Sequence, residues 1–319
     1  MKRNSLLKMV LFFSIAMVAF VGCTSNPDKE EVNEGSNKGT VTVTDVRGEV
    51  EIPEQPERLV DLSGNSDILS ILGYEVIGSA NSDAYDYKKF PSYLEDTLKG
   101  ATILGYSMQD TMDVEAVMNL NPDLIVISTV QEKMYDQLSS IAPTIMIELE
   151  ALDWKEDVKE LGKVFNKSDI ADKWLKEYEV KAKTAGEEVK KAYGEDTSYL
   201  SFLASGGQFF VFDGAGFGDV LYSDMKLAKP EGMPEQSDIS LPVVTYEGLA
   251  SIKSDYIFAI ATDEDLETLK ANPIWNNLPQ VKEGKVVQLD ASPYFNQGYS
   301  PIGRELLIDE IVDMLNETK

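Results

Sequence analysis

The chain has 319 residues, of which 43% are hydrophobic and 26% are charged, a composition typical of a folded globular protein. Its formal net charge is −26, with 55 Asp and Glu against 29 Lys and Arg, which argues against a nucleic-acid partner because phosphate binding depends on clustered basic side chains. Histidine is absent, which excludes Ser-His-Asp and Cys-His nucleophile systems and zinc sites built on imidazole.

The N-terminus has the pattern of an export signal. Three basic residues precede an apolar run at 9–21, which is too short for a comfortable membrane span. Cys23 follows this run and is the only cysteine, so an internal disulfide is impossible. Residues 23–40 lack hydrophobic periodicity and are rich in Gly, Ser, Asn and Glu. The sequence therefore predicts a signal peptide over 1–22 and a flexible tether over 23–40.

Strand and helix patterns alternate in the first half of the chain. Residues 41–52 alternate apolar and polar side chains around Arg47-Gly48, which predicts a β-hairpin. A buried strand then leads into the small polar loop 63–65 and a helix that ends at Gly73. Further apolar strands are expected at 76–80, 124–128 and 144–148. Strands that alternate with helices predict a parallel, doubly wound α/β sheet.

The second half repeats this order of elements. The segment 244–260 echoes 112–128 at a distance of 132 positions, so that Glu247 matches Glu115 and Asp255 matches Asp123. Each copy predicts a short helix, a turn at the Asp and an apolar strand. The repetition indicates two α/β lobes of like topology.

A long helix is expected between the lobes, over 168–193. Apolar residues recur there at helical spacing, namely Ile170, Trp174, Tyr178, Ala185, Val189 and Ala192. At 1.5 Å per residue the helix would span roughly 39 Å. Gly186 is expected to weaken it by about 1 kcal/mol. The sequence thus predicts an N-terminal lobe over 41–166, a connecting helix over 167–193 and a C-terminal lobe over 194–319, with small closing motions.

These features resemble a known family. The stretches "IPEQPERLVDLSGNSDILSILGYEVIG", "VEAVMNLNPDLIVIS" and "NPIWNNLPQVKEGKVVQLD" are similar to the substrate-binding proteins of bacterial ABC importers for ferric siderophores, haem and cobalamin. The N-terminal "FVGC" resembles a lipobox, with Phe20 where Leu is usual. The resemblance implies lipid attachment to Cys23, anchoring on the extracytoplasmic face of the membrane, and an ABC permease with its ATPase as partners. It also implies a monomer without a cofactor of its own, because the ligand brings the iron.

The candidate ligand site follows from the expected topology. In open α/β sheets a ligand lies beyond the carboxyl ends of the strands, here in a cleft between the lobes. The small residues expected at these ends are Ser63, Gly64, Asn65, Thr129, Val130, Ser205, Gly206 and Gly207. Aromatic residues and one Met fall in polar, turn-rich loops, where they suit a bulky amphipathic ligand: Tyr85, Tyr87, Tyr106, Met108, Phe217, Tyr294, Phe295 and Tyr299.

Two glutamates occupy equivalent places in the repeated segments. Glu115 and Glu247 each lie near the start of a short helix, where the helix dipole favours a carboxylate. The resemblance implies a second role, because in similar importers one surface Glu per lobe meets Arg residues of the permease.

The expected charge of the site favours some iron chelates over others. The basic residues of the candidate loops are few, namely Lys88, Lys89, Lys133 and Arg304. A tris-catecholate carries a large negative charge and would need a basic cluster. A ferric hydroxamate or mixed citrate-hydroxamate fits better, although Phe217 stands where similar hydroxamate binders commonly place an Arg.

Other ligands and functions remain open at this point. Haem would need an axial ligand, and without His that ligand would be Met108 or a Tyr of the cleft; no direct metal ligand is expected otherwise. Cobalamin needs no protein ligand. An exported enzyme that uses paired carboxylates, as glycosidases do, and a surface adhesion or scaffold protein are alternatives of other classes.

Overall fold

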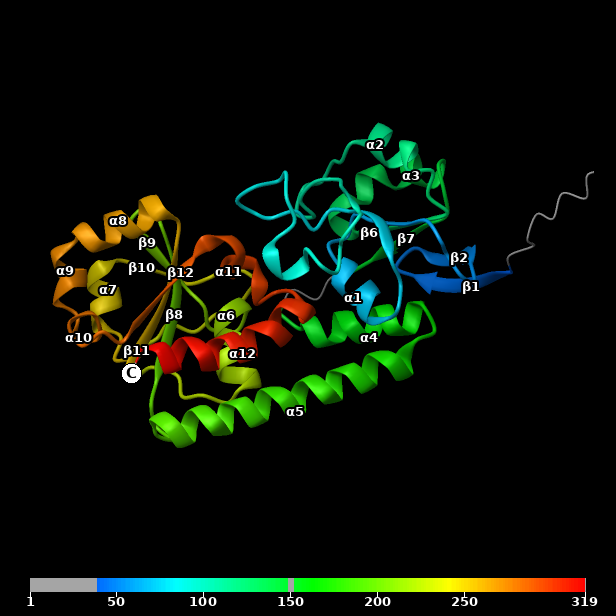
Figure 1. The fold of residues 1–319 in the computed structure, drawn as a ribbon. Helices are drawn as coiled ribbons and strands as arrows, with labels where there is room; N and C mark the ends of the chain where they lie inside the picture. Colours follow the sequence, from blue (N-terminus) through cyan, green and yellow to red (C-terminus); the bar gives the residue numbers. More distant parts are fainter. Residues whose placement is uncertain (1–38, 149–151, 319) are drawn as a thin grey trace, which may run out of the picture. The chain divides into compact units, whose positions relative to one another are not determined.

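The computed structural model describes residues 39–148 and 152–318, and the structural statements below concern these residues (Figure 1). The segment Lys38–Lys319 forms one compact unit. The expected signal peptide, Cys23 and most of the expected tether lie outside the described residues. No helix in the described part of the chain combines the length and the apolar character needed to cross a membrane.

The predicted hairpin is confirmed at the start of the folded unit. Strands β1 (Thr40–Asp45) and β2 (Gly48–Pro53) pair antiparallel, with Asp45 opposite Gly48. One carboxylate oxygen of Asp45 accepts the backbone N–H groups of Arg47 and Gly48 at 2.8 and 3.1 Å, which closes the turn. The other oxygen accepts the N–H of Met146 at 2.7 Å. Asp45 therefore shapes the hairpin and joins it to the neighbouring sheet.

The N-terminal lobe is built on a fully parallel sheet, as the sequence predicts. Its strand order is β5-β4-β3-β6-β7. The strands are β3 (Leu59–Asp61), β4 (Val76–Ser79), β5 (Thr102–Ile103), β6 (Leu124–Ser128) and β7 (Thr144–Ile147). The helices of this lobe are α1 (Ser66–Ile71), η1 (Ser92–Leu94), α2 (Val114–Asn119), η2 (Thr129–Met134), α3 (Tyr135–Ser139) and α4 (Trp154–Val164). The strand order reverses between β3 and β6, so loops there converge at the carboxyl ends of the strands.

The C-terminal lobe repeats the strand order but not the direction of every strand. Its sheet runs β10-β9-β8-β11-β12. The strands are β8 (Tyr199–Ser205), β9 (Gln208–Val211), β10 (Val243–Val244), β11 (Tyr256–Ala261) and β12 (Val286–Asp290). The helices are α6 (Gly216–Asp219), η3 (Val220–Asp224), α7 (Tyr246–Ser251), α8 (Asp263–Ala271), α9 (Pro273–Asn277), α10 (Pro279–Lys282), α11 (Ala291–Gln297) and α12 (Pro301–Glu317).

The pairs β8–β11 and β11–β12 of this second sheet are parallel, as the sequence predicts, and a hairpin at one edge adds antiparallel pairs. Strand β9 is antiparallel to both β8 and β10. Ser205 pairs with Gln208, so only Gly206 and Gly207 form the turn, at φ +57° and +76°. Two-residue turns with positive φ at both positions suit glycine and match the twist of a hairpin. The small-residue loop after β8 is thus a tight reversal within the sheet.

The repeated sequence segments form equivalent units, α2–β6 and α7–β11. The Asp113 carboxylate accepts the N–H of Ala116 at the start of α2, and the Thr245 hydroxyl accepts that of Gly248 at the start of α7. The repeated aspartates also act alike. Asp123 accepts the N–H groups of the two residues just before β3 at 2.9 Å each. Asp255 accepts the N–H of Ser198, just before β8, at 2.8 Å. Each repeat therefore fixes its strand beside the first strand of its own sheet.

Helix α5 (Ser168–Tyr193) has the bounds that the sequence predicts and connects the two lobes. Its buried residues are Ala171, Leu175, Tyr178, Ala182, Ala185, Gly186 and Val189. Ile170 and Ala192, which the sequence places on this stripe, are exposed instead. A Cβ on Gly186 would lie 1.8 Å from the Met225 carbonyl oxygen. Gly186 therefore lets α5 approach the C-terminal lobe closely.

The hydrophobic core continues from one lobe into the other. One cluster of buried residues includes Ile68 of α1, Leu175 of α5, Phe258 of β11 and Ile308 of α12. Helix α12 contacts α5 and also α1 and η1 of the N-terminal lobe. The lobes therefore share packed side chains in addition to the covalent link through α5.

Candidate functional site

Loops from three neighbouring strands of the N-terminal lobe converge at their carboxyl ends. Gly64 follows β3 with φ +90°, and a Cβ on it would lie 2.6 Å from the hydroxyl of Ser107, in the loop after β5. Asn81, just after β4, forms an isolated bridge with Tyr106 and donates its side-chain N–H to the Gly64 carbonyl at 2.7 Å. The close approach that Gly64 allows thus brings the loops after β3, β4 and β5 together.

A buried carboxylate holds the first of these loops. Asp61 accepts the hydroxyls of Ser63 and Ser66, both at 2.6 Å. Burial raises the pKa of Asp61, and the two hydroxyl hydrogen bonds oppose that rise. Ser63 is only 1% exposed and in turn accepts the side-chain N–H of Asn65 at 3.2 Å. Ser63 and Asn65 therefore stabilise the conformation of the loop. Of the three candidate ligand-binding residues in this loop, Gly64 is the one that is partly exposed.

Aromatic rings from both lobes meet next to these loops. Tyr87 stacks on Tyr106, with ring centroids 5.5 Å apart and 10° between the planes. Tyr85 meets Phe295 of α11 edge-on, at 6.0 Å and 85°. Phe295 also lies 6.3 Å from Tyr299. We call these five residues the aromatic cluster. Tyr85 and Tyr87 are 44% and 50% exposed, so the cluster combines apolar area with hydroxyls at the surface.

Polar contacts also cross between the lobes at this place. The Ser292 hydroxyl of α11 donates to Asp83 at 2.5 Å, and the Ser300 hydroxyl donates to Asp67 at 2.5 Å. Tyr106 forms a side-chain hydrogen bond with Asn296. Sequence reasoning missed both aspartates. Asp83 lies in the same loop as Tyr85 and Tyr87, but nothing in the sequence indicates a partner 209 positions away.

The aromatic cluster lies in a negative environment. Burial raises the pKa of Tyr85 to about 12, and the carboxylates of Asp265 and Asp83 add to the rise. Asp265 belongs to α8 of the C-terminal lobe and Asp83 to the N-terminal lobe. At this place both lobes thus present negative charge close to a tyrosine hydroxyl.

Comparison with known proteins identifies the scaffold. The family model described as "Periplasmic binding protein" matches residues 67–293. The iron(3+)-hydroxamate-binding protein FhuD of Bacillus subtilis (strain 168) is 30% identical over 322 aligned residues, which cover 96% of each chain. The chain belongs to the periplasmic binding protein family.

Two further similarities support this assignment. The iron(3+)-hydroxamate-binding protein YxeB of the same Bacillus subtilis strain is 29% identical to this periplasmic binding protein, over 99% of this chain and 97% of its own. A crystal structure of an FhuD fold-family component of a ferrichrome ABC transporter from Bacillus subtilis superposes with a TM-score of 0.70 at 28% identity. It covers 86% of this chain and 99% of its own.

Phe217 is not a cleft residue, which corrects the sequence-based hypothesis. Its side chain is fully buried, and its ring lies 5.1 Å from that of Phe258 in the sheet. The turn-rich sequence around it forms the short helix α6. Gly298 packs closely against this helix, since a Cβ on Gly298 would lie 2.5 Å from the Phe217 nitrogen. Phe217 is therefore a core residue, although it lies in a glycine-rich segment.

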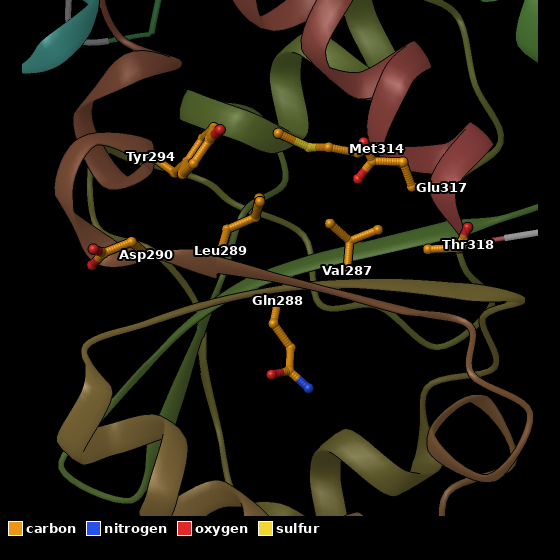
Figure 2. Close-up of a pocket in the computed structure, with 8 residues that line it drawn as sticks. All are labelled: Val287, Gln288, Leu289, Asp290, Tyr294, Met314, Glu317 and Thr318. Carbon is orange, nitrogen blue, oxygen red and sulfur yellow. The ribbon is translucent and has the colours of Figure 1, made fainter.

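Tyr294 lines a hollow to which no residue of the aromatic cluster contributes. Figure 2 shows it beside a hollow of about 460 Å³ between β12 and α12, which Leu289 and Met314 also line. Burial raises the pKa of Tyr294, and the charge of Glu310 on α12 contributes. A second hollow of the same size lies between α5 and α12. No residue of the aromatic cluster lines either hollow. The sequence predicts an open cleft between the lobes, but among the described residues the facing loops of the two lobes are in contact.

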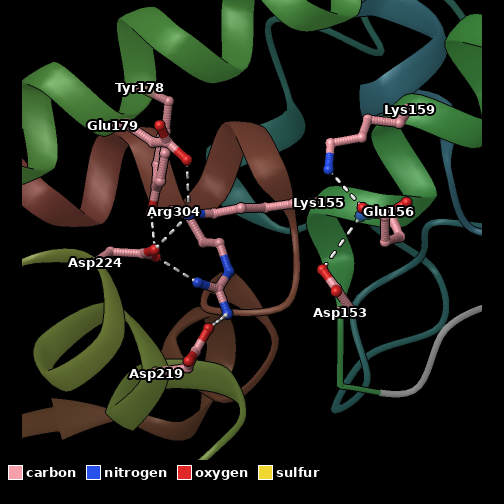
Figure 3. Close-up of polar contacts among 9 residues, drawn as sticks. All are labelled: Asp153, Lys155, Glu156, Lys159, Tyr178, Glu179, Asp219, Asp224 and Arg304. Carbon is pink, nitrogen blue, oxygen red and sulfur yellow. Dashed lines mark hydrogen bonds and ion pairs between the residues drawn. The ribbon is translucent and has the colours of Figure 1, made fainter.

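Arg304 is an internal cation and not a basic residue of the site. It is 2% exposed and pairs with Asp219 at 2.8 Å and Asp224 at 2.6 Å (Figure 3). Asp224 also accepts the hydroxyl of Tyr178 at 2.6 Å and pairs with Lys155 of α4 at 3.3 Å. This buried network joins α4, α5, η3 and α12.

The remaining candidates lie at loops on the surface or within turns. Met108 is 56% exposed, and Thr129 is exposed at the start of η2. Lys133 pairs with Asp110 on the surface. Lys88 and Lys89 are exposed near Tyr87. Among the described residues no group of three or more His, Cys, Asp or Glu side chains could hold a metal ion.

The two glutamates expected at the permease interface are equivalent in the structure. Glu115 is the second residue of α2 and Glu247 is the second residue of α7, and both are exposed. Glu247 accepts the hydroxyl of Thr245 at 3.0 Å. Each lobe therefore carries one acidic side chain at the start of a short surface helix.

Proposed function

We propose that the protein captures a ferric hydroxamate siderophore outside the cytoplasm and delivers it to an ABC permease. The observation that supports this most directly is the aromatic cluster, to which both lobes contribute at the ends of their sheets. Tyr and Phe bind the apolar backbone of a bulky chelate, and the Tyr hydroxyls suit its carbonyl oxygens. The two relatives described above are themselves named as iron(3+)-hydroxamate-binding proteins.

The charge around the cluster favours this class of chelate. Burial raises the pKa of Tyr85, and the carboxylates of Asp265 and Asp83, one from each lobe, add to the rise. A tris-catecholate complex with several negative charges would be repelled by these carboxylates, whereas a neutral or cationic trihydroxamate would not. Arg304, the basic residue closest in sequence to Tyr299, is already neutralised by two aspartates, whereas Lys88 and Lys89 beside Tyr87 are exposed.

Delivery and anchoring complete the proposal. Glu115 and Glu247 would meet basic residues of the permease, one per lobe, so that the permease senses both lobes at once. The protein would be held at the membrane by a lipid on Cys23, after removal of residues 1–22, and would work as a monomer. It would release its ligand chemically unchanged, as a binding protein does.

Ligand titration tests the proposed function. The intrinsic fluorescence of the protein is followed while ferrichrome, ferrioxamine B, a ferric tris-catecholate, ferric citrate, haem or cobalamin is added. Saturable quenching by the two hydroxamates, but not by their iron-free forms, is expected. Binding of the tris-catecholate or of haem in preference to both hydroxamates would contradict the proposal.

The anchor has its own test. Cys23→Ala is expected to release the protein from the membrane fraction and to leave hydroxamate affinity unchanged, because Cys23 precedes the folded unit. Immunoblots of membrane and soluble fractions measure the first effect, and fluorescence titration measures the second. Full membrane retention of the variant would refute lipid anchoring at this residue.

A further inference from the structure

Two similar hydrogen bonds join the lobes, and each pairs a serine of the C-terminal lobe with a buried aspartate of the N-terminal lobe. Ser300 donates to Asp67 and Ser292 donates to Asp83, both at 2.5 Å. Asp67 and Asp83 are 1% and 2% exposed. The two pairs differ in what surrounds them, and this difference suggests separate roles.

The Asp67–Ser300 pair is part of the shared core. Asp67 lies in α1, whose Ile68 and Leu69 belong to the same hydrophobic cluster as Leu307 and Ile308 of α12. Ser300 is 8% exposed and also accepts the N–H of Gly303 at 3.1 Å, which caps α12. Separation of this pair would expose apolar side chains of α1 and α12 to water, at a high free-energy cost.

The Asp83–Ser292 pair instead joins the loop after β4 to the irregular start of α11, where Ser292 has non-helical φ and ψ of −97° and 119°; we call these two segments the loops. One oxygen of Asp83 accepts the backbone N–H groups of Tyr85 and Asp86, at 2.8 and 3.1 Å. The other oxygen is thereby aimed at Ser292. The adjacent interlobe contact is the edge-on meeting of Tyr85 and Phe295, and Tyr85 is 44% exposed. The Tyr106–Asn296 hydrogen bond also joins the lobes here, so separation of these loops breaks two hydrogen bonds and the Tyr85–Phe295 ring contact.

We propose that Asp83 and Ser292 form a latch, which closes the two loops over the ligand site, whereas Asp67 and Ser300 form a pivot that stays closed. When the latch is closed, the backbone contacts of Asp83 position Tyr85 against Phe295. A ligand held by the aromatic cluster leaves only when the latch opens. Ser292 is therefore a positioning residue that controls the rate of ligand release.

The role in ligand release rests on the proposed function, but the opening of the loops does not. Three variants separate the possibilities: Ser292→Ala removes the latch hydroxyl, Ser292→Thr keeps it, and Ser300→Ala removes the pivot hydroxyl. Amide hydrogen exchange of the peptides around 80–89 and 288–298 reports opening without any ligand. Stopped-flow fluorescence with ferrioxamine B reports dissociation, and thermal unfolding reports stability.

Ser292→Ala is expected to speed both exchange in these peptides and dissociation of ferrioxamine B by roughly tenfold, the effect of losing a hydrogen bond to a charged group. Its Tm should fall by only about 2–4 °C, because the change removes one hydrogen bond and no apolar side chain. Ser292→Thr should behave like the original protein. Ser300→Ala should lower the Tm by a few degrees, because it removes the cap of α12, and leave loop exchange unchanged.

The proposal is overturned if Ser292→Ala leaves loop exchange unchanged, or if Ser300→Ala opens the same loops as much as Ser292→Ala does. Faster exchange with an unaltered dissociation rate would refute the role in ligand release. If the original protein binds no ferric hydroxamate, the proposed function fails, while the exchange measurement still decides whether the latch exists.

Discussion

Asp67 has an unusually high pKa for a carboxylate near the start of a helix. It lies in the first turn of α1, where an acidic residue is ordinarily solvated, yet here it is 1% exposed. Burial raises its pKa from 3.8 to about 6, and the hydroxyl of Ser300 opposes the rise. The nearby carboxylate of Asp61 also disfavours the charged form. A charged Asp67 at neutral pH therefore reduces the stability of the fold.

The pH dependence of stability tests this assignment. Because the folded pKa lies above the unfolded value, the folded state binds the proton more tightly. The resulting stabilisation is fully present below about pH 4 and is lost as the pH rises through about 6. Between pH 7.5 and pH 5 the original protein should gain about 1.4 kcal/mol relative to Asp67→Asn, as measured by urea unfolding. A difference independent of pH would show that Asp67 titrates normally.

The aromatic cluster leads to a second prediction about single residues. Tyr85→Ala and Phe295→Ala should each weaken ferrichrome binding by about tenfold, because each removes a large ring from the proposed ligand contact. Tyr294→Ala is the matched control, since it changes the neighbour of Phe295 but faces the hollow beside α12. Fluorescence titration measures the affinities. Equal losses for all three variants would place the site elsewhere or indicate a general loss of structure.

At the scale of elements, α12 is the helix that most closely ties the parts together. It contacts α1 and η1 in the N-terminal lobe and α5 between the lobes. Its Arg304 reaches Asp219 of α6 and Asp224 of η3, and its guanidinium lies 4.7 Å from the ring centre of Trp154 in α4. A helix that the sequence assigns to the C-terminal lobe is therefore packed against both.

Removal of the Arg304 side chain should strongly lower the free energy of unfolding. Arg304→Ala leaves the buried Asp224 and the part-buried Asp219 without their main cation, and loss of one partner in a buried ion network costs about 3–5 kcal/mol. Urea unfolding measures the loss. Lys133→Ala is the control, because its pair with Asp110 is on the surface and should contribute less than about 1 kcal/mol. A similar small effect for both variants would contradict the structural role of Arg304.

For the whole molecule, the central feature is the pairing of two like lobes, each with its own α/β repeat. The repeats place Glu115 and Glu247 at equivalent positions on α2 and α7. A partner that contacts both glutamates would be sensitive to any change in the relative position of the lobes.

Uptake assays test this arrangement. Glu115→Ala combined with Glu247→Ala should abolish hydroxamate-dependent iron uptake by cells, because two charge pairs with the permease are lost. Ligand affinity should be unchanged, since neither side chain belongs to the aromatic cluster. Glu132→Ala with Glu264→Ala, which alters one exposed acidic residue in each lobe, is the control. Impaired ligand binding in the first double variant would assign these glutamates to the ligand site or to the fold.

Features that depend on local residue pattern could be predicted from the amino-acid sequence alone. Helical periodicity defined α5, alternation defined the first hairpin, and the echo of 112–128 in 244–260 revealed the two lobes. The sequence also indicated Tyr85 and Tyr106, because aromatic residues in polar loops have no local packing explanation. Family resemblance added the class of protein, which the comparisons support.

Which loop residues face each other, in contrast, becomes visible only when the elements of the folded chain are packed together. Phe217 and Tyr294 resemble Tyr85 in local sequence, but one is buried beside Phe258 and the other faces α12. The sequence predicts Arg304 to be a free cation of the site. In the structure it is bound by Asp219 and Asp224, which lie 85 and 80 positions earlier in the chain. The pairs Asp67–Ser300 and Asp83–Ser292 span 233 and 209 positions. Contacts at such separations depend on how whole elements pack, and local residue patterns carry no record of that packing.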